Sequence, residues 1–257
     1  MTDENDLVIR DSDNVRQVTV NRPRAMNSLR LATLWQLREV LRSIPAELDR
    51  PDGCRALVIT GAGERAFCAG ADIKELQVIG AERAAEQATL GQEVFTELES
   101  APVVTIAAIN GYALGGGLEL ALACDFRIAS ADAQLGQPEV GLGTIPGWGG
   151  TVRLPRLIGT PAAKELIFSS ERVGAARAYE LGLVDRVVEA ADLLTAADEF
   201  ATRFTPRSPR AIARAKAAIH AGLTQGSDGL QAEARFVAEA AAQGGNEGIA
   251  AFGRGAN

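Results

Sequence analysis

Histidine and cysteine are scarce in this 257-residue sequence, and their scarcity excludes several kinds of active site. The single histidine, His220, would have to serve any Ser–His–Asp mechanism and any His-rich metal site. It lies in the Ala- and Arg-rich stretch RAIARAKAAIHAG, which is typical of a helix surface or a helix end. If the chain is an enzyme, we therefore expect carboxylates to transfer protons, and we expect no metal site.

The three cysteines, Cys54, Cys68 and Cys124, form no CxxC motif and are odd in number, which argues against a disulfide framework or a zinc ribbon. We expect buried thiols in a reducing cytoplasm. The first residues, MTDENDLVIRDSD, lack the basic and apolar parts of a secretory signal. The longest apolar run, around 103–109, is far shorter than the roughly 20 residues of a membrane span. These features predict a cytoplasmic protein.

Positively charged residues are outnumbered, because the chain has 26 Lys and Arg residues and 33 Asp and Glu residues, which gives a net charge of −7. The chain therefore lacks the field that non-specific binding to nucleic acids or anionic membranes needs. A hydrophobic fraction of 47% and a charged fraction of 23% are those of a globular chain with a sizeable core. We expect no nucleic-acid partner and no membrane partner.

Apolar periodicity predicts strands in the first half of the chain and helices in the second. Strand patterns occupy 15–20, 55–60, 103–109, 126–128 and 133–135, and helical patterns occupy 31–44, 81–98 and 118–124. Residues 66–71 and 136–150 are expected to form loops. Further helices are predicted at 151–158, 160–169, 174–182, 191–205, 208–222 and 227–242. This order indicates an α/β core followed by a helical region.

Backbone amides that could stabilise an oxyanion occur in two segments, while the phosphate-binding motifs GxxxxGKS/T and GxGxxG are missing. In INGYALGGGLELALACD, a buried strand leads through three glycines into a helix, which exposes the Gly116 amide to a ligand oxygen. Those glycines would equally suit close packing of strand against helix. In RAFCAGADIKEL, a small-residue loop could supply the Ala71 amide, or could simply form a tight turn before a helix.

Two glutamates lie close to these glycines in the sequence. Glu119 is in the first turn of the apolar helix, and Glu139 follows Pro138 in GQPEVGLG. Each could be a general acid or base, or only a carboxylate favoured by a helix dipole. The sequence does not show that the two meet, and a pair of carboxylates would also suit a glycosidase. A glycosidase mechanism, however, would not explain the AFCAGAD loop or the triple glycine.

Five motifs in order resemble the enoyl-CoA hydratase/isomerase (crotonase) family over nearly the whole chain. They are VTVNRPRAMNSL (18–29), AFCAGADIKEL (66–76), AAINGYALGGGLELALACD (107–125), LGQPEVGLGTIPGWGGTVRLPRLIG (135–159) and ARAYELGLVDRVV (176–188). The resemblance implies an α/β fold, a spiral of ββα units over 1–195 carrying an acyl-CoA site. It also implies a C-terminal helical region over 196–257 that forms trimers, often paired into hexamers.

The resemblance also implies a reaction, because family members stabilise the enolate of an acyl-CoA thioester. Its oxyanion donors would be the amides of Ala71 and Gly116. Glutamates at both acid–base positions are typical of hydratases: Glu119 would activate water for attack at C3 and Glu139 would protonate C2 of a trans-2-enoyl-CoA. This would make the chain a lyase of fatty acid β-oxidation. The alternatives are an enoyl-CoA isomerase, a hydratase of branched or dicarboxylic substrates, or a non-catalytic scaffold, which the two glutamates argue against.

Coenzyme A would belong to the substrate, so no separate cofactor is expected. By the resemblance, CoA contacts fall at Arg24, Ala25, Met26, Ala69, Gly70, Asp72, Ile73 and Lys74, with Arg65 as a further basic candidate. Any one of the basic residues could instead be a solvated surface charge. The chain departs from the pattern at Trp148, which either lines the acyl cavity or only packs over a short helix. It departs again in the short tail GRGAN after Phe252, which lacks Lys-mediated CoA contacts.

Overall fold

The structure is a computed structural model that describes residues 5–223, without the side chains of 76–85. Its contacts divide the chain into two compact units, and the boundary in the sequence falls between Pro206 and Arg207. The functional division predicted between residues 195 and 196 stays a prediction.

Two sheets form the framework of the first unit. The larger has the order β1 (Leu7–Ser12), β2 (Val15–Val20), β3 (Ala56–Gly61), β5 (Val104–Ile109), β7 (Phe126–Ser130) and β10 (Arg186–Val188). The smaller has the order β4 (Ala66–Cys68), β6 (Tyr112–Leu114), β8 (Gln134–Gly136) and β9 (Arg172–Gly174). Only β1 and β9 pair antiparallel with their neighbours.

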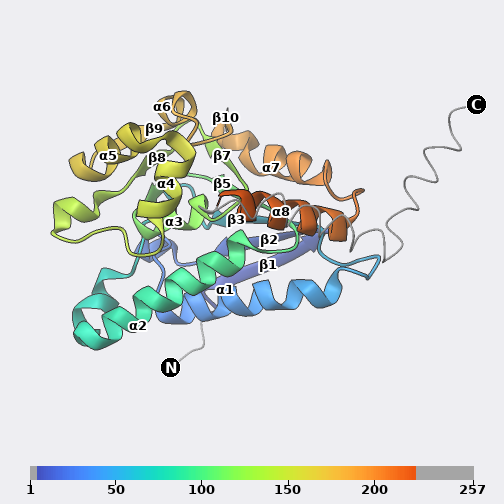
Figure 1. The fold of residues 1–257 in the computed structure, drawn as a ribbon, viewed down its shortest axis with the longest axis horizontal. Coiled ribbons are helices and arrows are strands. Elements are labelled where there is room, and N and C mark those ends of the chain that lie inside the picture. Colours follow the sequence, from blue (N-terminus) through green and yellow to red (C-terminus); the bar gives the residue numbers. More distant parts are fainter. Residues whose placement is uncertain (1–4, 224–257) are drawn as a thin grey trace, which may run out of the picture. The chain divides into compact units, whose positions relative to one another are not determined.

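From β3 to β8, consecutive strands alternate between the sheets. The pairs β3–β4, β5–β6 and β7–β8 each place one strand in the larger sheet and the next in the smaller, and helices then return the chain. This arrangement is the predicted spiral of ββα units within an α/β fold (Figure 1).

Helices follow the strand pairs and cover the sheets. The α-helices of the first unit are α1 (Leu31–Ser43), α2 (Ile73–Glu99), α3 (Gly116–Leu122), α4 (Gly150–Ile158), α5 (Thr160–Ser169), α6 (Ala175–Glu180) and α7 (Leu193–Thr202). Four 3-10 helices join them: η1 (Pro23–Ala25), η2 (Ile44–Glu47), η3 (Pro138–Leu142) and η4 (Ala190–Asp192). The described part of the second unit holds α8 (Pro209–Leu223), and the helix predicted at 227–242 lies outside the described residues.

Both faces of the central strands β3 and β5 are buried, which explains their continuous apolar runs. Leu57 and Ile59 of β3 point into the main core, which also holds Leu34 and Leu37 of α1. The side chain of Val58, which lies between them in the strand, points to the opposite face of the sheet. Helix α7 packs on β3, β5 and β7 from that face. Figure 1 shows α1 and α2 lying alongside each other, as their packing requires.

Several short elements differ from the sequence-based predictions. Residues 66–71 were expected to form a loop, but 66–68 are strand β4, and strands were expected to end at residue 135, whereas β9 and β10 follow. Both errors have the same physical reason, since a three-residue strand is too short to show a period of two. Helix α2 begins at Ile73 rather than at residue 81, because the Asp72 side chain caps it by accepting a hydrogen bond from the Lys74 amide.

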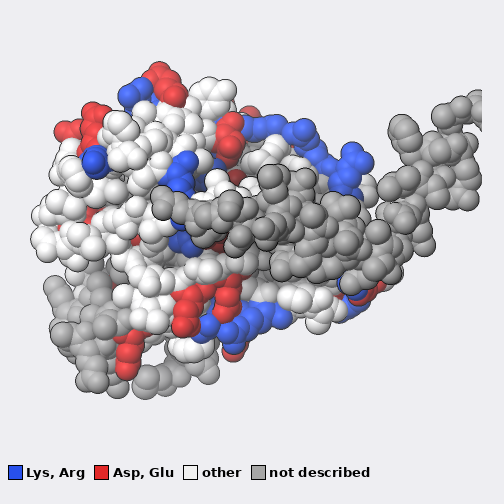
Figure 2. Space-filling view, in the orientation of Figure 1, with Lys and Arg blue, Asp and Glu red and all other residues white. Residues whose placement is uncertain are grey.

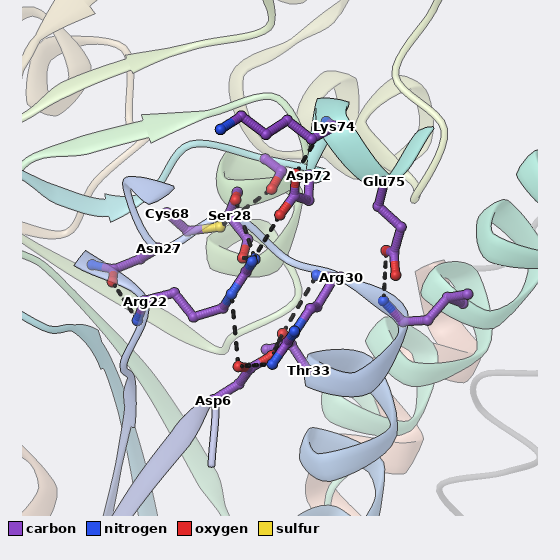
Figure 3. Close-up of polar contacts among 12 residues, drawn as sticks. Asp6, Arg22, Asn27, Ser28, Arg30, Thr33, Cys68, Asp72, Lys74 and Glu75 are labelled. Atoms are coloured by element: carbon purple, nitrogen blue, oxygen red, sulfur yellow. Dashed lines mark hydrogen bonds and ion pairs between the residues drawn. The ribbon is translucent and has the colours of Figure 1, made fainter. Parts of the chain in front are cut away.

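A buried polar cluster fixes the start of the chain to the loop after β2 (Figure 3). Asp6 is 2% exposed and accepts hydrogen bonds from Nε and Nη2 of Arg30, both at 2.7 Å. Thr33 Oγ1 also donates to Asp6, and Arg22 Nε lies 3.6 Å from its carboxylate. Three side chains from 22–33 therefore converge on one carboxylate.

The same cluster reaches the start of α2. Arg22 Nη2 donates to Asp72 at 2.8 Å, and Arg22 Nη1 donates to the Ser28 carbonyl at 2.6 Å. Glu75 accepts a hydrogen bond from the Leu31 amide at 2.9 Å, which also caps α1. The loop between β2 and α1 is thus held against the loop between β4 and α2 by charged and capping contacts.

Charged side chains of both signs are interspersed over the face drawn in Figure 2. In the part of the chain that the structure describes, no helix is both long and apolar enough to cross a bilayer.

We expect Asp6→Asn to lower the free energy of unfolding at pH 7 by about 3 kcal/mol, because it deprives Arg30 of a buried carboxylate partner. Burial alone would raise the pKa of Asp6, but hydrogen bonds from Arg30 and Thr33 and the charges of Arg30 and Arg22 hold this pKa below its ordinary value. The stabilisation is therefore present above the unfolded-state pKa of about 3.9 and is lost as pH falls through the lower folded-state pKa.

Urea unfolding of the wild type and Asp6→Asn at pH 7 and at decreasing acid pH measures this effect. The control is Asp52→Asn, because Asp52 pairs with Arg50 on the exposed surface. A destabilisation by Asp6→Asn that stays constant as the pH falls would contradict the assignment.

Candidate active site

The candidate site residues follow three neighbouring strands of the smaller sheet. Residues 69–72 follow β4, residues 115–119 follow β6, and residues 137–139 follow β8. These strands are parallel neighbours, with Leu114 of β6 opposite Gly136 of β8. Because carboxyl ends of parallel strands lie at one edge of a sheet, the fold brings the three segments together.

Glu119 is a buried carboxylate held by backbone amides. It lies on α3 and is 1% exposed, and its Oε1 accepts hydrogen bonds from the Trp148 and Gly150 amides, both at 2.7 Å. Burial raises the pKa of Glu119, while the two amides and the charge of Arg153 act in the opposite direction. The pKa of Glu119 is raised overall, and the two amide donors limit that rise by favouring the ionised form, which is the form that accepts a proton.

Glu139 lies in the first turn of η3. Burial raises its pKa to about 7, and the negative charge of Glu119 adds to this rise. The hydrogen-bonding pattern turns the amide nitrogen of the fully buried Gln137 toward Glu139, where it donates to both carboxylate oxygens at 3.1 and 3.0 Å. The structure therefore brings the two predicted glutamates into one electrostatic environment. Burial and the charge of Glu119 favour the protonated form of Glu139 near neutral pH, and the Gln137 donors act in the opposite direction.

The amides of Ala71 and Gly116 lie close together beside these carboxylates. A Cβ atom placed on Gly116 would be 3.4 Å from the Ala71 nitrogen, and one on Gly70 would be 3.2 Å from the Gly116 nitrogen. Gly70 has φ +97° and Gly115 has φ +54°, and a Cβ on Gly115 would come within 2.7 Å of Glu139 Oε1. Glycine is needed at both positions, because any side chain would be strained and would crowd the site.

The predicted CoA-contact segments are also brought together. The Ala69 amide donates to the Met26 carbonyl at 3.0 Å, and the Leu29 amide donates to the Gly70 carbonyl at 2.8 Å. Ala25 is half-buried beside Met26, whereas Arg24 is exposed. The segment 24–26 therefore lies against the loop that carries the Ala71 amide.

The remaining CoA candidates divide into two groups. Ile73 and Lys74 are exposed at the start of α2, next to the half-buried Asp72, and Figure 3 shows all but Ile73 labelled there. Arg65 is exposed and precedes β4, at the opposite end of that strand from Ala69. At about 3.3 Å per residue, the strand separates their backbones by about 13 Å. The structure thus groups the former residues with the site and leaves Arg65 apart.

The groups that hold the two carboxylates were not predicted from the sequence. Gln137, which donates to Glu139, and the amides of Trp148 and Gly150, which donate to Glu119, come from segments expected to be loop. A backbone donor carries no sequence signal, and Gln137 shows none beyond its place two residues before Glu139. In the described residues, no group of three or more His, Cys, Asp or Glu is arranged to hold a metal ion.

Comparison with known proteins places this geometry in a family. The family model described as enoyl-CoA hydratase/isomerase matches residues 10–254. A short-chain-enoyl-CoA hydratase of Clostridium acetobutylicum is 42% identical, over 85% of this chain and 82% of the relative. A crotonyl-CoA hydratase of Syntrophomonas wolfei is 40% identical, over 96% of this chain and 94% of the relative.

A solved structure agrees with the sequence relatives. The crystal structure of an enoyl-CoA hydratase from Bacillus anthracis superposes with a TM-score of 0.89 at 40% identity, covering 97% of this chain and 96% of that one. The predicted crotonase-type α/β fold is thereby confirmed. Because the family model matches nearly the whole length of this chain, the chain belongs to the enoyl-CoA hydratase/isomerase family.

Proposed function

We propose that this chain is a hydratase that adds water across the C2=C3 double bond of trans-2-enoyl-CoA to give 3-hydroxyacyl-CoA. The observation that carries the proposal is the pairing of the buried Glu119 with the half-buried Glu139, in different surroundings, next to two close backbone amides. Relatives whose names specify hydration of short-chain enoyl-CoA and crotonyl-CoA support the same reaction.

The two glutamates have separate roles in this reaction. Glu119, whose two amide donors favour its ionised form, takes a proton from water as the water oxygen bonds to C3. Glu139, with a pKa of about 7, gives its proton to C2. One water is consumed, and the proton gained by Glu119 matches the one lost by Glu139. Transfer of a proton from Glu119 back to Glu139 through solvent resets the site.

The amides of Ala71 and Gly116 hold the thioester oxygen while negative charge develops on it. Each donor of this kind contributes about 3 kcal/mol to transition-state stabilisation. CoA itself enters as part of the substrate along 24–26 and 69–74, so the reaction needs no separate cofactor. Arg24 and Lys74, both exposed, are the proposed partners of the CoA phosphates, with Arg65 as an outlying candidate.

The proposed assembly is a homotrimer or a hexamer of paired trimers. The surface of η3, α4 and α5 and the loop between η3 and α4 exposes large apolar side chains, including Leu142 (68% exposed), Ile145 (67%) and Phe168 (66%). Apolar groups gathered in this way mark interfaces between chains. We also propose action in the cytoplasm, because Cys54, Cys68 and Cys124 are buried thiols rather than disulfides. A role in fatty acid β-oxidation is proposed from the reaction itself, the hydration of a trans-2-enoyl-CoA.

An enoyl-CoA isomerase is the second candidate function, because the matched family model covers both activities. Isomerisation moves a proton between carbons and needs no activated water. Hydration is favoured because the Trp148 and Gly150 amides bind Glu119 and support it as a second proton acceptor.

Loss of the conjugated enoyl-thioester absorbance of crotonyl-CoA tests the reaction directly. We expect Glu119→Gln and Glu139→Gln each to lower kcat by about 10²–10⁴-fold, because each removes one proton transfer. The control is Glu189→Gln, since Glu189 is exposed and outside the site. Full rates in either site variant would contradict the two-glutamate mechanism.

The pH dependence tests the assignment of Glu139 as the acid. Because its pKa is raised to about 7, Glu139 carries the needed proton below that pH and loses it above. We expect kcat/KM for hydration to fall as pH rises through about 7, and the fall to be missing in the residual activity of Glu139→Gln. An unchanged alkaline limb in that variant would assign the pKa to another group.

Light scattering of the purified protein tests the assembly. We expect a mass three or six times the 26.9 kDa of the chain. Phe168→Asp should give smaller species, because it places a charge in the proposed apolar interface. A wild-type monomer would refute the assembly and leave the proposed reaction untouched.

A further inference from the structure

The indole of Trp148 fills the space between α2 and the glycine that begins α3. A Cβ atom placed on Gly116 would lie 2.4 Å from Cζ3 and 2.5 Å from Cε3 of the ring. A Cβ atom placed on Gly91 of α2 would lie 2.4 Å from Cδ1 and from Nε1. The two edges of the ring system are therefore pressed against two backbones, and the residue is only 5% exposed.

Trp148 is held rigidly in this position. Its ring meets Phe95 of α2 edge to face, with centroids 5.6 Å apart. Its carbonyl accepts a hydrogen bond from Arg153 at 2.9 Å, and Arg153 is paired with Glu99 of α2 at 2.7 Å. The adjacent Gly147 carbonyl accepts from Gln92 at 2.8 Å. Rotation of the indole out of its place would break this packing against α2.

The place that Trp148 fills adjoins the reacting carbons. Its ring covers Gly116, whose amide binds the thioester oxygen in the proposed reaction, and its own amide binds Glu119, which acts at C3. In the proposed reaction C3 lies beside the Glu119 carboxylate, so the acyl carbons beyond C3 begin there. Trp148 therefore contacts both groups, Gly116 through its ring and Glu119 through its backbone amide.

A surface groove lies next to the same residue. The groove has a volume of about 370 Å³, and its lining includes Gln92 and Thr96 of α2, Arg153 and Arg156 of α4, and Trp148. Trp148 thus contacts Gly116 and Glu119 of the site and also lines this outer groove.

We infer that Trp148 is a specificity-determining residue that closes the acyl end of the site and restricts the enzyme to short acyl chains such as crotonyl. The inference deepens the proposed hydratase function and rests on it. A close-packed ring leaves no room for added methylenes, and each methylene that an apolar pocket cannot accept changes kcat/KM by about 10–200-fold. Removing the ring would open the site toward the outer groove and admit longer chains.

The test compares kcat/KM for crotonyl-CoA and trans-2-decenoyl-CoA in the wild type, Trp148→Ala and Trp148→Phe. We expect the wild type to prefer the four-carbon substrate, and Trp148→Ala to raise the decenoyl-to-crotonyl ratio by at least about tenfold. Trp148→Phe should raise it less. The matched control is Trp35→Ala, which removes the other tryptophan of the chain from the exposed face of α1 and should leave the ratio unchanged.

A second measurement covers the case in which Trp148→Ala folds poorly. Thermal unfolding is recorded for each variant, and binding of butyryl-CoA and decanoyl-CoA to Trp148→Phe is measured by calorimetry, which needs no turnover. Tighter relative binding of decanoyl-CoA than in the wild type supports the inference.

The outcomes separate the inference from the reaction on which it rests. Equal kcat/KM of the wild type for both chain lengths, or ratios unchanged in both Trp148 variants, would overturn the inference while hydration of crotonyl-CoA stands. A wild type that binds both acyl-CoA compounds and hydrates neither would overturn the proposed function and the inference together.

Discussion

Glu119 places a carboxylate inside an apolar helix, and such a group is costly to bury unless hydrogen bonds replace its lost water. The replacement comes from the amides of Trp148 and Gly150, in the turn that begins α4. That turn is fixed by α2, because Gln92 donates to the Gly147 carbonyl. The need to satisfy one carboxylate therefore determines where α4 begins, how its turn meets α2 and where the Trp148 ring must go.

The edge of the smaller sheet supplies the rest of the site. Each of three parallel strands delivers one component there: β4 the Ala71 amide, β6 the Gly116 amide with Glu119, and β8 Glu139 with its donor Gln137. The components directly follow paired strands, and this short connection favours the preorganisation that electrostatic stabilisation requires. The cluster around Asp6 in Figure 3 extends this rigidity to the 22–33 segment.

Much of the fold was predictable from the sequence, and the reason lies in element length. Strand β3 and helix α1 are long enough for their apolar periods to appear, and both were predicted within one residue at each end. Strands of three residues such as β4 carry no period, and the smaller sheet consists entirely of them. Of the sheet that builds the site, only β8 was predicted, as 133–135, and β4, β6 and β9 were missed.

The candidate site could be predicted as separate residues but not as a constellation. Glu119 and Glu139 were identifiable because glycines and apolar residues surround them in the sequence. Their meeting depends on the pairing of Leu114 with Gly136 across two strands, a contact between distant segments that local sequence does not encode. Gln137 was missed for the same reason, since its importance comes only from the carboxylate beside which the fold places it.

The contact between Gly91 and Trp148 restricts the order in which mutations can accumulate at this site. A side chain gained at Gly91 collides with the ring at 2.4 Å, and the ring has no free direction in which to retreat because Gly116 lies against its other edge. A smaller residue at Trp148 leaves a void, which weakens the core without a steric clash. A descendant of this chain can therefore change position 148 first and fill the space from position 91 afterwards, while the opposite order passes through an overpacked intermediate.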